Sequence, residues 1–269
     1  MSQEPQQEHI SKKLVVYKMP GMDDVNVRRD ETYRTTDAGA LTMDLYYPQD
    51  AKSGARMPAI VVVAGYPDPG YERILGCKFK EMGWTISWAR LAAASGLVAI
   101  AYTNREPAAD LQALLQYVRK NAASLSIDED RIGVLAGSGN VPLALSTLMQ
   151  DPKSTPKCGV LCYGYTLDLD GSTAIADAAR QWGFAYPSAG KSVDDLQQDV
   201  PLFVARASQD DRSLNEAIDR FVMKALARSL PLTLVNHPGP HAFDLFQDTE
   251  ISRETVRQIL SFMRFHLRA

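Results

Sequence analysis

The sequence predicts an α/β protein with a mostly parallel, doubly wound sheet, helices on both faces and antiparallel strands at its N-terminal edge. Three observations lead to this prediction. From residue 58 onward, short and continuous apolar runs follow one another, which is typical of strands covered on both faces. Helical patterns separate these runs, as in repeated strand–helix units. Residues 13–48 instead read as half-buried antiparallel strands, in which apolar and polar side chains alternate.

The expected elements follow in order along the chain. The alternating pattern is clearest in LTMDLYYP at 41–48. The apolar runs after it read AIVVVAG, GLVAIAY, RIGVLAG, CGVLCYG, PLFVARA and LPLTLVN. Apolar residues recur at helical spacing in 84–95, in 107–122, in 213–230 and in the last segment of the chain, around Val256, Ile259, Leu260 and Met263.

Length and composition favour a single domain. The chain has 269 residues, of which 45% are hydrophobic and 23% charged, and one large core suits that size. We therefore expect a polar N-terminal tail over 1–12 and one domain over 13–269.

One interval, 164–200, is too long for a simple connection. It forms either a surface excursion with one short helix or a flap or pocket wall. In the second case Trp182, Phe184 and Tyr186 supply aromatic contacts for a substrate.

Charge and hydropathy exclude several classes of partner. The net charge is −3, and no basic run is longer than Lys12-Lys13, so neither nucleic acid nor an anionic membrane is an expected partner. The chain starts with a polar, acidic segment unlike a signal peptide, and no segment is apolar for the ~18 residues of a membrane span. We expect a soluble, cytoplasmic protein that acts on a small molecule. The sequence does not indicate its oligomeric state.

The segment RIGVLAGSGNVPLAL at 131–145 places Ser138 between two glycines where a strand gives way to a helix. A dinucleotide-binding turn would need a third glycine where Pro142 stands, and it would belong to the first parallel strand. A serine nucleophile at a sharp strand-to-helix turn fits the order of elements better. Gly137 and Gly139 could also form a plain tight turn, so the other members of a site decide between these interpretations.

A serine nucleophile needs a base and an orienting carboxylate. Of the four histidines, His9 lies in the tail and His266 on the last helix. His237 ends the last predicted strand, where a structural role is expected. His241 follows in the Pro- and Gly-rich loop NHPGPHAFDLF, so His241 is a candidate base and His237 remains its competitor at this point.

Taken together, the strand, the turn Ala136-Gly137-Ser138-Gly139-Asn140 and the helix resemble the nucleophile elbow of the α/β-hydrolase superfamily. The resemblance extends from about Leu41 to the last helix. Within the superfamily, the chain most resembles the dienelactone hydrolase-like and carboxylesterase-like members. Their H-x-F pattern matches His241-Ala242-Phe243. The elbow departs from G-x-S-x-G, with alanine and asparagine in place of the outer glycines. Dienelactone hydrolases commonly carry a cysteine nucleophile, so serine favours a carboxylesterase.

The resemblance also implies the acid of a catalytic triad. The G-x-x-D pattern of the family, aligned on Ser208, selects Asp211 over Asp210, which would then be a surface or capping carboxylate. Some relatives carry the acid one strand earlier, so Asp168 and Asp170 remain alternatives.

An oxyanion hole needs two N–H groups directed at the substrate oxygen. The resemblance assigns one to Gly139, directly after the nucleophile. The other belongs to the loop after the first parallel strand, where relatives carry His-Gly-Gly or His-Gly-x. Here that loop reads Ala64-Gly65-Tyr66, so Tyr66 N–H is the candidate.

The function implied by this resemblance is a carboxylesterase-type serine hydrolase. Ser138 attacks the ester, His241 transfers the proton and Asp211 orients the imidazole. Tyr66 and Gly139 hold the oxyanion, and no metal or organic cofactor is required. Short-chain esters are expected because the sequence contains no large dedicated lid domain. The alternatives are a catalytically silent binding protein of the same fold and a serine peptidase or acyltransferase.

Overall fold

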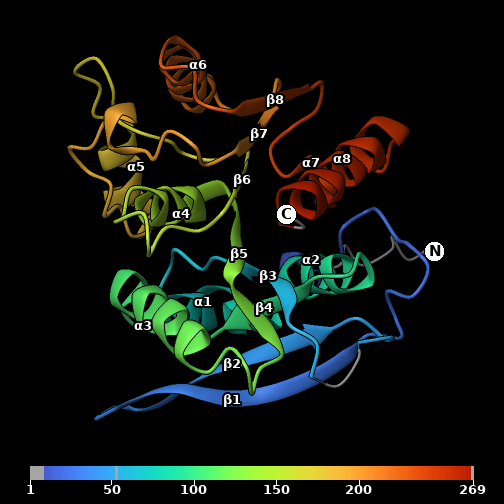
Figure 1. Cartoon of the computed structure of the whole chain (residues 1–269). Helices are drawn as coiled ribbons and strands as arrows, with labels where there is room; N and C mark the ends of the chain where they lie inside the picture. Colours follow the sequence, from blue (N-terminus) through green and yellow to red (C-terminus); the bar gives the residue numbers. More distant parts are fainter. Residues whose placement is uncertain (1–8, 52–53, 268–269) are drawn as a thin grey trace, which may run out of the picture.

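A mixed sheet of eight strands runs through the described part of the chain (Figure 1), in the order β1-β2-β4-β3-β5-β6-β7-β8. The computed structural model describes residues 9–51 and 54–267. The first two strands pair antiparallel with each other, β2 pairs antiparallel with β4, and the remaining neighbours are parallel. The strands are β1 (Asn26–Thr36), β2 (Gly39–Tyr47), β3 (Met57–Val62), β4 (Val98–Tyr102), β5 (Ile127–Gly137), β6 (Gly159–Cys162), β7 (Leu202–Ala207) and β8 (Leu232–His237).

Helices alternate with the parallel strands and cover the sheet. Figure 1 shows α2 and α8 on one face and α3 and α4 on the other. The α-helices are α1 (Asp68–Leu75), α2 (Gly83–Ala94), α3 (Pro107–Lys120), α4 (Val141–Leu148), α5 (Ala174–Trp182), α6 (Arg212–Ala227), α7 (Phe243–Phe246) and α8 (Glu250–Leu267). Short 3-10 helices occupy η1 (Ile10–Lys12), η2 (Phe79–Glu81), η3 (Ser138–Asn140) and η4 (Val193–Asp195).

Burial follows from this layering. Every residue of β4 and of β6 is buried, because helices cover both faces of the central strands, and this explains their continuous apolar sequences. The predicted fold class, a mostly parallel doubly wound sheet with an antiparallel N-terminal edge, is confirmed. Within the described residues, no helix is both long enough and apolar enough to cross a bilayer.

The N-terminal segment differs from our prediction. Strand structure begins at Asn26 rather than near residue 13. The chain before it lies across other elements: Val15 N–H donates to Ser87 Oγ (3.2 Å), and Val16 N–H donates to the Asp244 carbonyl (2.8 Å). The backbone N–H groups of Val15 and Val16 thus form hydrogen bonds to helices and not to a neighbouring strand. Of the expected tail 1–12, residues 1–8 lie outside the described residues.

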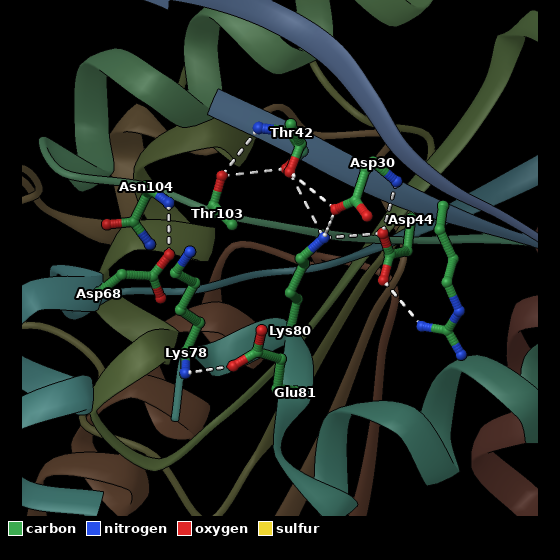
Figure 2. A network of polar contacts seen from close by, with 10 residues as sticks. Asp30, Thr42, Asp44, Asp68, Lys78, Lys80, Glu81, Thr103 and Asn104 are labelled. Carbon is green, nitrogen blue, oxygen red and sulfur yellow. Dashed lines mark hydrogen bonds and ion pairs between the residues drawn. The ribbon is translucent and has the colours of Figure 1, made fainter. Parts of the chain in front are cut away.

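A buried cation fastens η2 to the antiparallel edge of the sheet (Figure 2). The Lys80 side chain is 7% exposed, and its Nζ lies 2.6 Å from Asp30 Oδ1 and 2.8 Å from Asp44 Oδ1. Burial alone lowers the pKa of Lys80, but the hydrogen bonds to the two carboxylates outweigh it and raise the pKa. Asp44 is also buried, at 4% exposed, and breaking a buried pair of this kind by removing one partner typically costs about 3–5 kcal/mol, so η2 is firmly held.

A second buried carboxylate closes the segment before η2 (Figure 2). Asp68, the first residue of α1, accepts the Asn104 N–H on Oδ2, as Figure 2 shows, and the Phe79 N–H on Oδ1, both at 2.9 Å. Burial raises the pKa of Asp68, although these two hydrogen bonds oppose the rise. Residues 68–79 therefore form a loop whose two ends meet at one carboxylate.

Candidate active site

Ser138 lies at a strained turn between β5 and α4. Its φ angle is +57°, in the left-handed region that non-glycine residues rarely adopt. Such a turn lifts the serine hydroxyl above the carboxyl edge of the sheet, as in a nucleophile elbow. Pro142 follows in the first turn of α4, where its missing N–H leaves no helical hydrogen bond unmade.

Three side chains form one hydrogen-bonded series at this edge. Ser138 Oγ lies 2.9 Å from His241 Nε2, and His241 Nδ1 lies 2.6 Å from Asp210 Oδ2. The Asp210 side chain is 7% exposed, whereas that of His241 is 38% exposed. A carboxylate shielded from water and bonded to Nδ1 fixes the ring so that Nε2 can accept the serine proton.

The acid in this series is Asp210, not Asp211 as the sequence pattern predicted. The chain turns after β7, with Asp210 N–H donating to the Ala207 carbonyl, and this turn directs Asp210 toward the histidine. Asp211 instead begins α6: its exposed carboxylate accepts the N–H groups of Ser213 and Leu214 as a helix cap. The hydrogen bonds from Ser213 and Leu214 lower the pKa of Asp211.

Backbone hydrogen bonds join the loops that carry the acid and the base. Ser208 N–H donates to the His237 carbonyl at 2.8 Å, and Gln209 N–H donates to the Gly239 carbonyl at 3.0 Å. The Asp211 N–H also donates to Asp210 Oδ1 at 2.8 Å. One carboxylate oxygen is thus held by the backbone while the other meets the imidazole.

Asn140 connects the elbow to the predicted oxyanion loop. Its Oδ1 accepts the Gly65 N–H at 2.7 Å, and its Nδ2 donates to the Gly137 carbonyl at 2.9 Å. A Cβ on Gly65 would lie 2.8 Å from both the Asn140 Cα and the Gly139 carbonyl oxygen, so only glycine permits this approach. The asparagine that breaks the family pattern therefore ties the two loops together.

The two predicted oxyanion donors lie in these loops. The Tyr66 N–H donates to no atom of the described residues, so it remains available for a substrate oxygen. Gly139 follows Ser138 directly, and a Cβ there would meet the Tyr66 Oη at 2.2 Å and Phe184 at 2.8 Å. The Tyr66 ring thus covers Gly139, and burial raises the pKa of this phenol to about 12.

The interval 164–200 contributes to the site through α5 and the residues after it. Trp182, 59% exposed, lines a pocket together with Ser138. Phe184 is buried and lies edge-on to the Tyr66 ring at 5.7 Å, and Ala185 N–H donates to the Gly65 carbonyl at 2.8 Å. Trp182 therefore faces the pocket, whereas Phe184 supports the loop of Tyr66.

The pocket beside Ser138 and His241 has a volume of about 710 Å³. Apolar side chains from α1, η2, α2 and α7 make up most of its wall, and Asn140 is one of its few polar neighbours. Pockets of this size and polarity bind small organic molecules.

A fully buried carboxylate that the sequence analysis missed lies behind this wall. Asp244 accepts hydrogen bonds from Trp84 Nε1 (2.8 Å), Trp88 Nε1 (2.9 Å) and the Tyr163 hydroxyl (2.7 Å). Burial raises the pKa of Asp244, and the three donors oppose the rise. The Tyr163 ring lies edge-to-face with His241 at 5.0 Å. A carboxylate inside the apolar run HAFDLF was the available signal, since such a group needs buried partners.

The other candidates named from the sequence lie apart from this series. His237 is buried, bonds Ser252 Oγ through Nε2 (3.0 Å) and stacks on Phe243, which gives it a structural role. Asp168 accepts the N–H groups of Ile175 and Ala176 in the first turn of α5, and Asp170 pairs with Lys224. Across residues 9–51 and 54–267, no cluster of three His, Cys, Asp or Glu side chains could hold a metal ion.

No family model and no curated protein matches the chain. Several solved structures match the chain. The thermophilic esterase Est2 from the Planctomycetes species Thermogutta terrifontis aligns with a TM-score of 0.68 at 20% identity, over 91% of this chain and 94% of that one. Brefeldin A esterase, a bacterial homologue of human hormone-sensitive lipase, aligns with a TM-score of 0.72 at 16% identity, over 96% and 82%. The α/β hydrolase MGS-M1, from a Medee basin deep-sea metagenome library, gives 0.63 at 18% identity, over 91% and 99%.

These likenesses extend over nearly the whole chain and agree with the fold described above. They leave the narrower dienelactone hydrolase-like subtype as a prediction. The chain has the α/β-hydrolase fold.

Proposed function

We propose that the protein is a serine esterase that hydrolyses carboxylic esters through an acyl-enzyme on Ser138. The observation that carries this proposal is the hydrogen-bonded series Asp210–His241–Ser138, with contacts of 2.6 and 2.9 Å at the mouth of an apolar pocket. A serine hydroxyl is a poor nucleophile unless a held base removes its proton, and this geometry supplies such a base.

In the proposed mechanism, His241 Nε2 takes the proton of Ser138 as Oγ attacks the ester carbonyl carbon. The N–H groups of Tyr66 and Gly139 hold the oxygen that becomes negative. His241 then gives the proton to the leaving alcohol, and the C–O bond to that alcohol breaks. A water molecule, deprotonated by His241, attacks the acyl carbon; the bond from that carbon to Ser138 Oγ breaks, His241 returns the proton to Oγ, and the carboxylic acid is released. Asp210 keeps the imidazole in the required tautomer throughout.

The structural neighbours support this proposal by analogy. Est2 is described as an esterase, and its structures include forms bound to propionate and butyrate and a form phosphorylated by paraoxon. We propose a short acyl group for this chain as well, in line with the sequence-based expectation. Location in the cytoplasm stays a prediction.

The test is hydrolysis of p-nitrophenyl acetate, butyrate and octanoate by the wild type, Ser138→Ala and His241→Ala. Each triad variant should lose ~10⁶-fold in kcat, as serine hydrolases do when the nucleophile or base is removed. Ser146→Ala is the matched control, because this serine lies on α4 and bonds only the Leu143 carbonyl.

Equal, negligible rates in all proteins, together with no labelling of Ser138 by a fluorophosphonate, would refute the proposal and favour a silent binding protein. Labelling of Ser138 without ester hydrolysis would favour a peptidase or acyltransferase instead.

A further inference from the structure

The pocket wall is mostly apolar from Ser138 to the surface, where the exposed Arg73 of α1 also lines it. Beside Ser138 its lining includes Tyr71, Leu75, Phe79 and Met82. Tyr71 and Leu75 belong to α1, Phe79 belongs to η2, and Met82 directly follows η2.

The apolar lining continues outward as an exposed rim. Ile74 is 70% exposed, Phe246 48% and Ile10 40%, and all three line the pocket together with Trp182. Large exposed apolar side chains gathered around one opening indicate a binding surface rather than scattered surface residues.

Two aromatic residues of the wall have their polar atoms withdrawn from the pocket. The Trp84 N–H and the Tyr163 hydroxyl both donate to Asp244, which is 1% exposed behind them. Their remaining surface is carbon. Asp244 therefore makes the inner wall apolar by satisfying the donors that would otherwise need a polar ligand.

The wall is also firmly anchored. Lys80 is held between Asp30 and Asp44 (Figure 2), and Asp68 closes the loop 68–79 at its base. A wall fixed at both ends keeps its shape before a ligand arrives, which reduces the ordering cost of binding.

A short acyl group leaves most of this pocket unfilled. Pockets of ~300–1,000 Å³ bury most of the surface of a drug-sized ligand, and 710 Å³ lies within that range. A butyryl group has only a few heavy atoms. The remaining apolar surface must therefore suit the other part of the ester.

The direction of proton transfer indicates which part that is. The leaving alcohol must receive its proton from His241 Nε2, so the alcohol lies beside the loop of this histidine. Ala242 of that loop, and Leu245 and Phe246 of α7 directly after it, line the pocket. Resting on the proposed esterase function, we infer that the preferred substrates are esters of large apolar alcohols, with aryl groups or chains of six or more carbons.

The experiment measures kcat/KM for methyl, butyl, hexyl and phenyl butyrate at concentrations below aggregation. Each additional methylene should raise kcat/KM by up to about fourfold until the pocket is filled. A parallel series of methyl esters, from acetate to octanoate, varies the acyl group alone and should show little increase beyond butyrate.

Variants test whether the rim is responsible. In Ile74→Ser/Phe246→Ser, the ratio of hexyl to methyl butyrate kcat/KM should fall by roughly tenfold, because both changes remove apolar contact. Leu226→Ser is the matched control: Leu226 is 56% exposed on α6 and does not line the pocket, so the ratio should not change.

A preference that rises with acyl length but not with alcohol length would overturn the inference while leaving the esterase function intact. So would a hexyl-to-methyl ratio that is equal in the double variant and the wild type. If no ester is hydrolysed and a fluorophosphonate fails to label Ser138, the esterase function itself is refuted and the inference fails with it.

Discussion

Exchanging the carboxylate at position 210 for an amide should abolish most of the activity, whereas the same change at position 211 should not. In Asp210, Oδ1 accepts the Asp211 N–H and Oδ2 accepts His241 Nδ1. An asparagine has one acceptor oxygen and one NH₂ group, so it cannot accept both hydrogen bonds. His241 is then driven to the tautomer that carries its proton on Nε2, facing Ser138, where it cannot act as a base.

The expected loss follows from this wrong tautomer. An Asp→Asn change in a serine triad lowers kcat by ~10⁴-fold, which corresponds to about 5 kcal/mol of transition-state stabilisation. Asp211→Asn is the matched control one residue away. Asparagine caps a helix about as well as aspartate, so this variant should keep both kcat and the free energy of unfolding. Asp211→Ala should lose ~0.5–2 kcal/mol of stability with kcat unchanged.

The assay is steady-state hydrolysis of p-nitrophenyl butyrate beside urea unfolding of each variant. The reasoning is refuted if Asp211→Asn loses the activity and Asp210→Asn keeps it, since the family pattern would then have identified the acid. It is also refuted if Asp210→Asn loses activity only in proportion to a loss of folded protein.

Two further predictions concern side chains around the site. Asn140→Ala removes the acceptor of the Gly65 N–H and the donor to the Gly137 carbonyl, so we expect ~1–3 kcal/mol lower stability and a lower kcat; unchanged values in urea unfolding and in the ester assay would contradict this. Burial lowers the pKa of His237 below 6.5 in the folded protein. As the pH falls, His237 therefore takes up a proton in the unfolded chain before it does so in the folded protein. The stability that neutral His237 contributes is present above pH 6.5 and is lost as the pH falls toward the folded-state pKa. Urea unfolding between pH 7.5 and 5 should therefore show a smaller loss of stability for His237→Gln than for the wild type, and parallel losses would argue against it.

The sequence predicted the sheet and two of the three residues in the hydrogen-bonded series. Continuous apolar runs report burial on both faces, and the Gly-Ser-Gly turn and the H-x-F loop each lie beside the strand that positions them. Asp210 was not predicted, because one turn of backbone decides which of two adjacent carboxylates faces the histidine. A capping interpretation of Asp211, directly before the apolar stripe of α6, was the signal that could have separated them.

The pocket was the least predictable part. Its wall combines α1, η2, α7 and the N-terminal Ile10, and these contacts depend on long-range packing that no local pattern encodes. The Asn140 side chain could be noticed only as a departure from the elbow pattern. Its hydrogen bond to Gly65 joins residues 75 positions apart, which periodicity and spacing cannot reveal.

The closure of the loop 68–79 at Asp68 affects which changes in sequence and length this loop can tolerate. Because both ends of this loop meet at one buried carboxylate, residues between them can be exchanged, lengthened or shortened without disturbing the register of any strand. Ile74 and Leu75 lie in that exchangeable stretch and line the pocket. Grafting a loop from another hydrolase between Asp68 and Phe79 would thus transplant a pocket wall as one unit, and libraries built there could diversify selectivity while the nucleophile, base and acid stay in place.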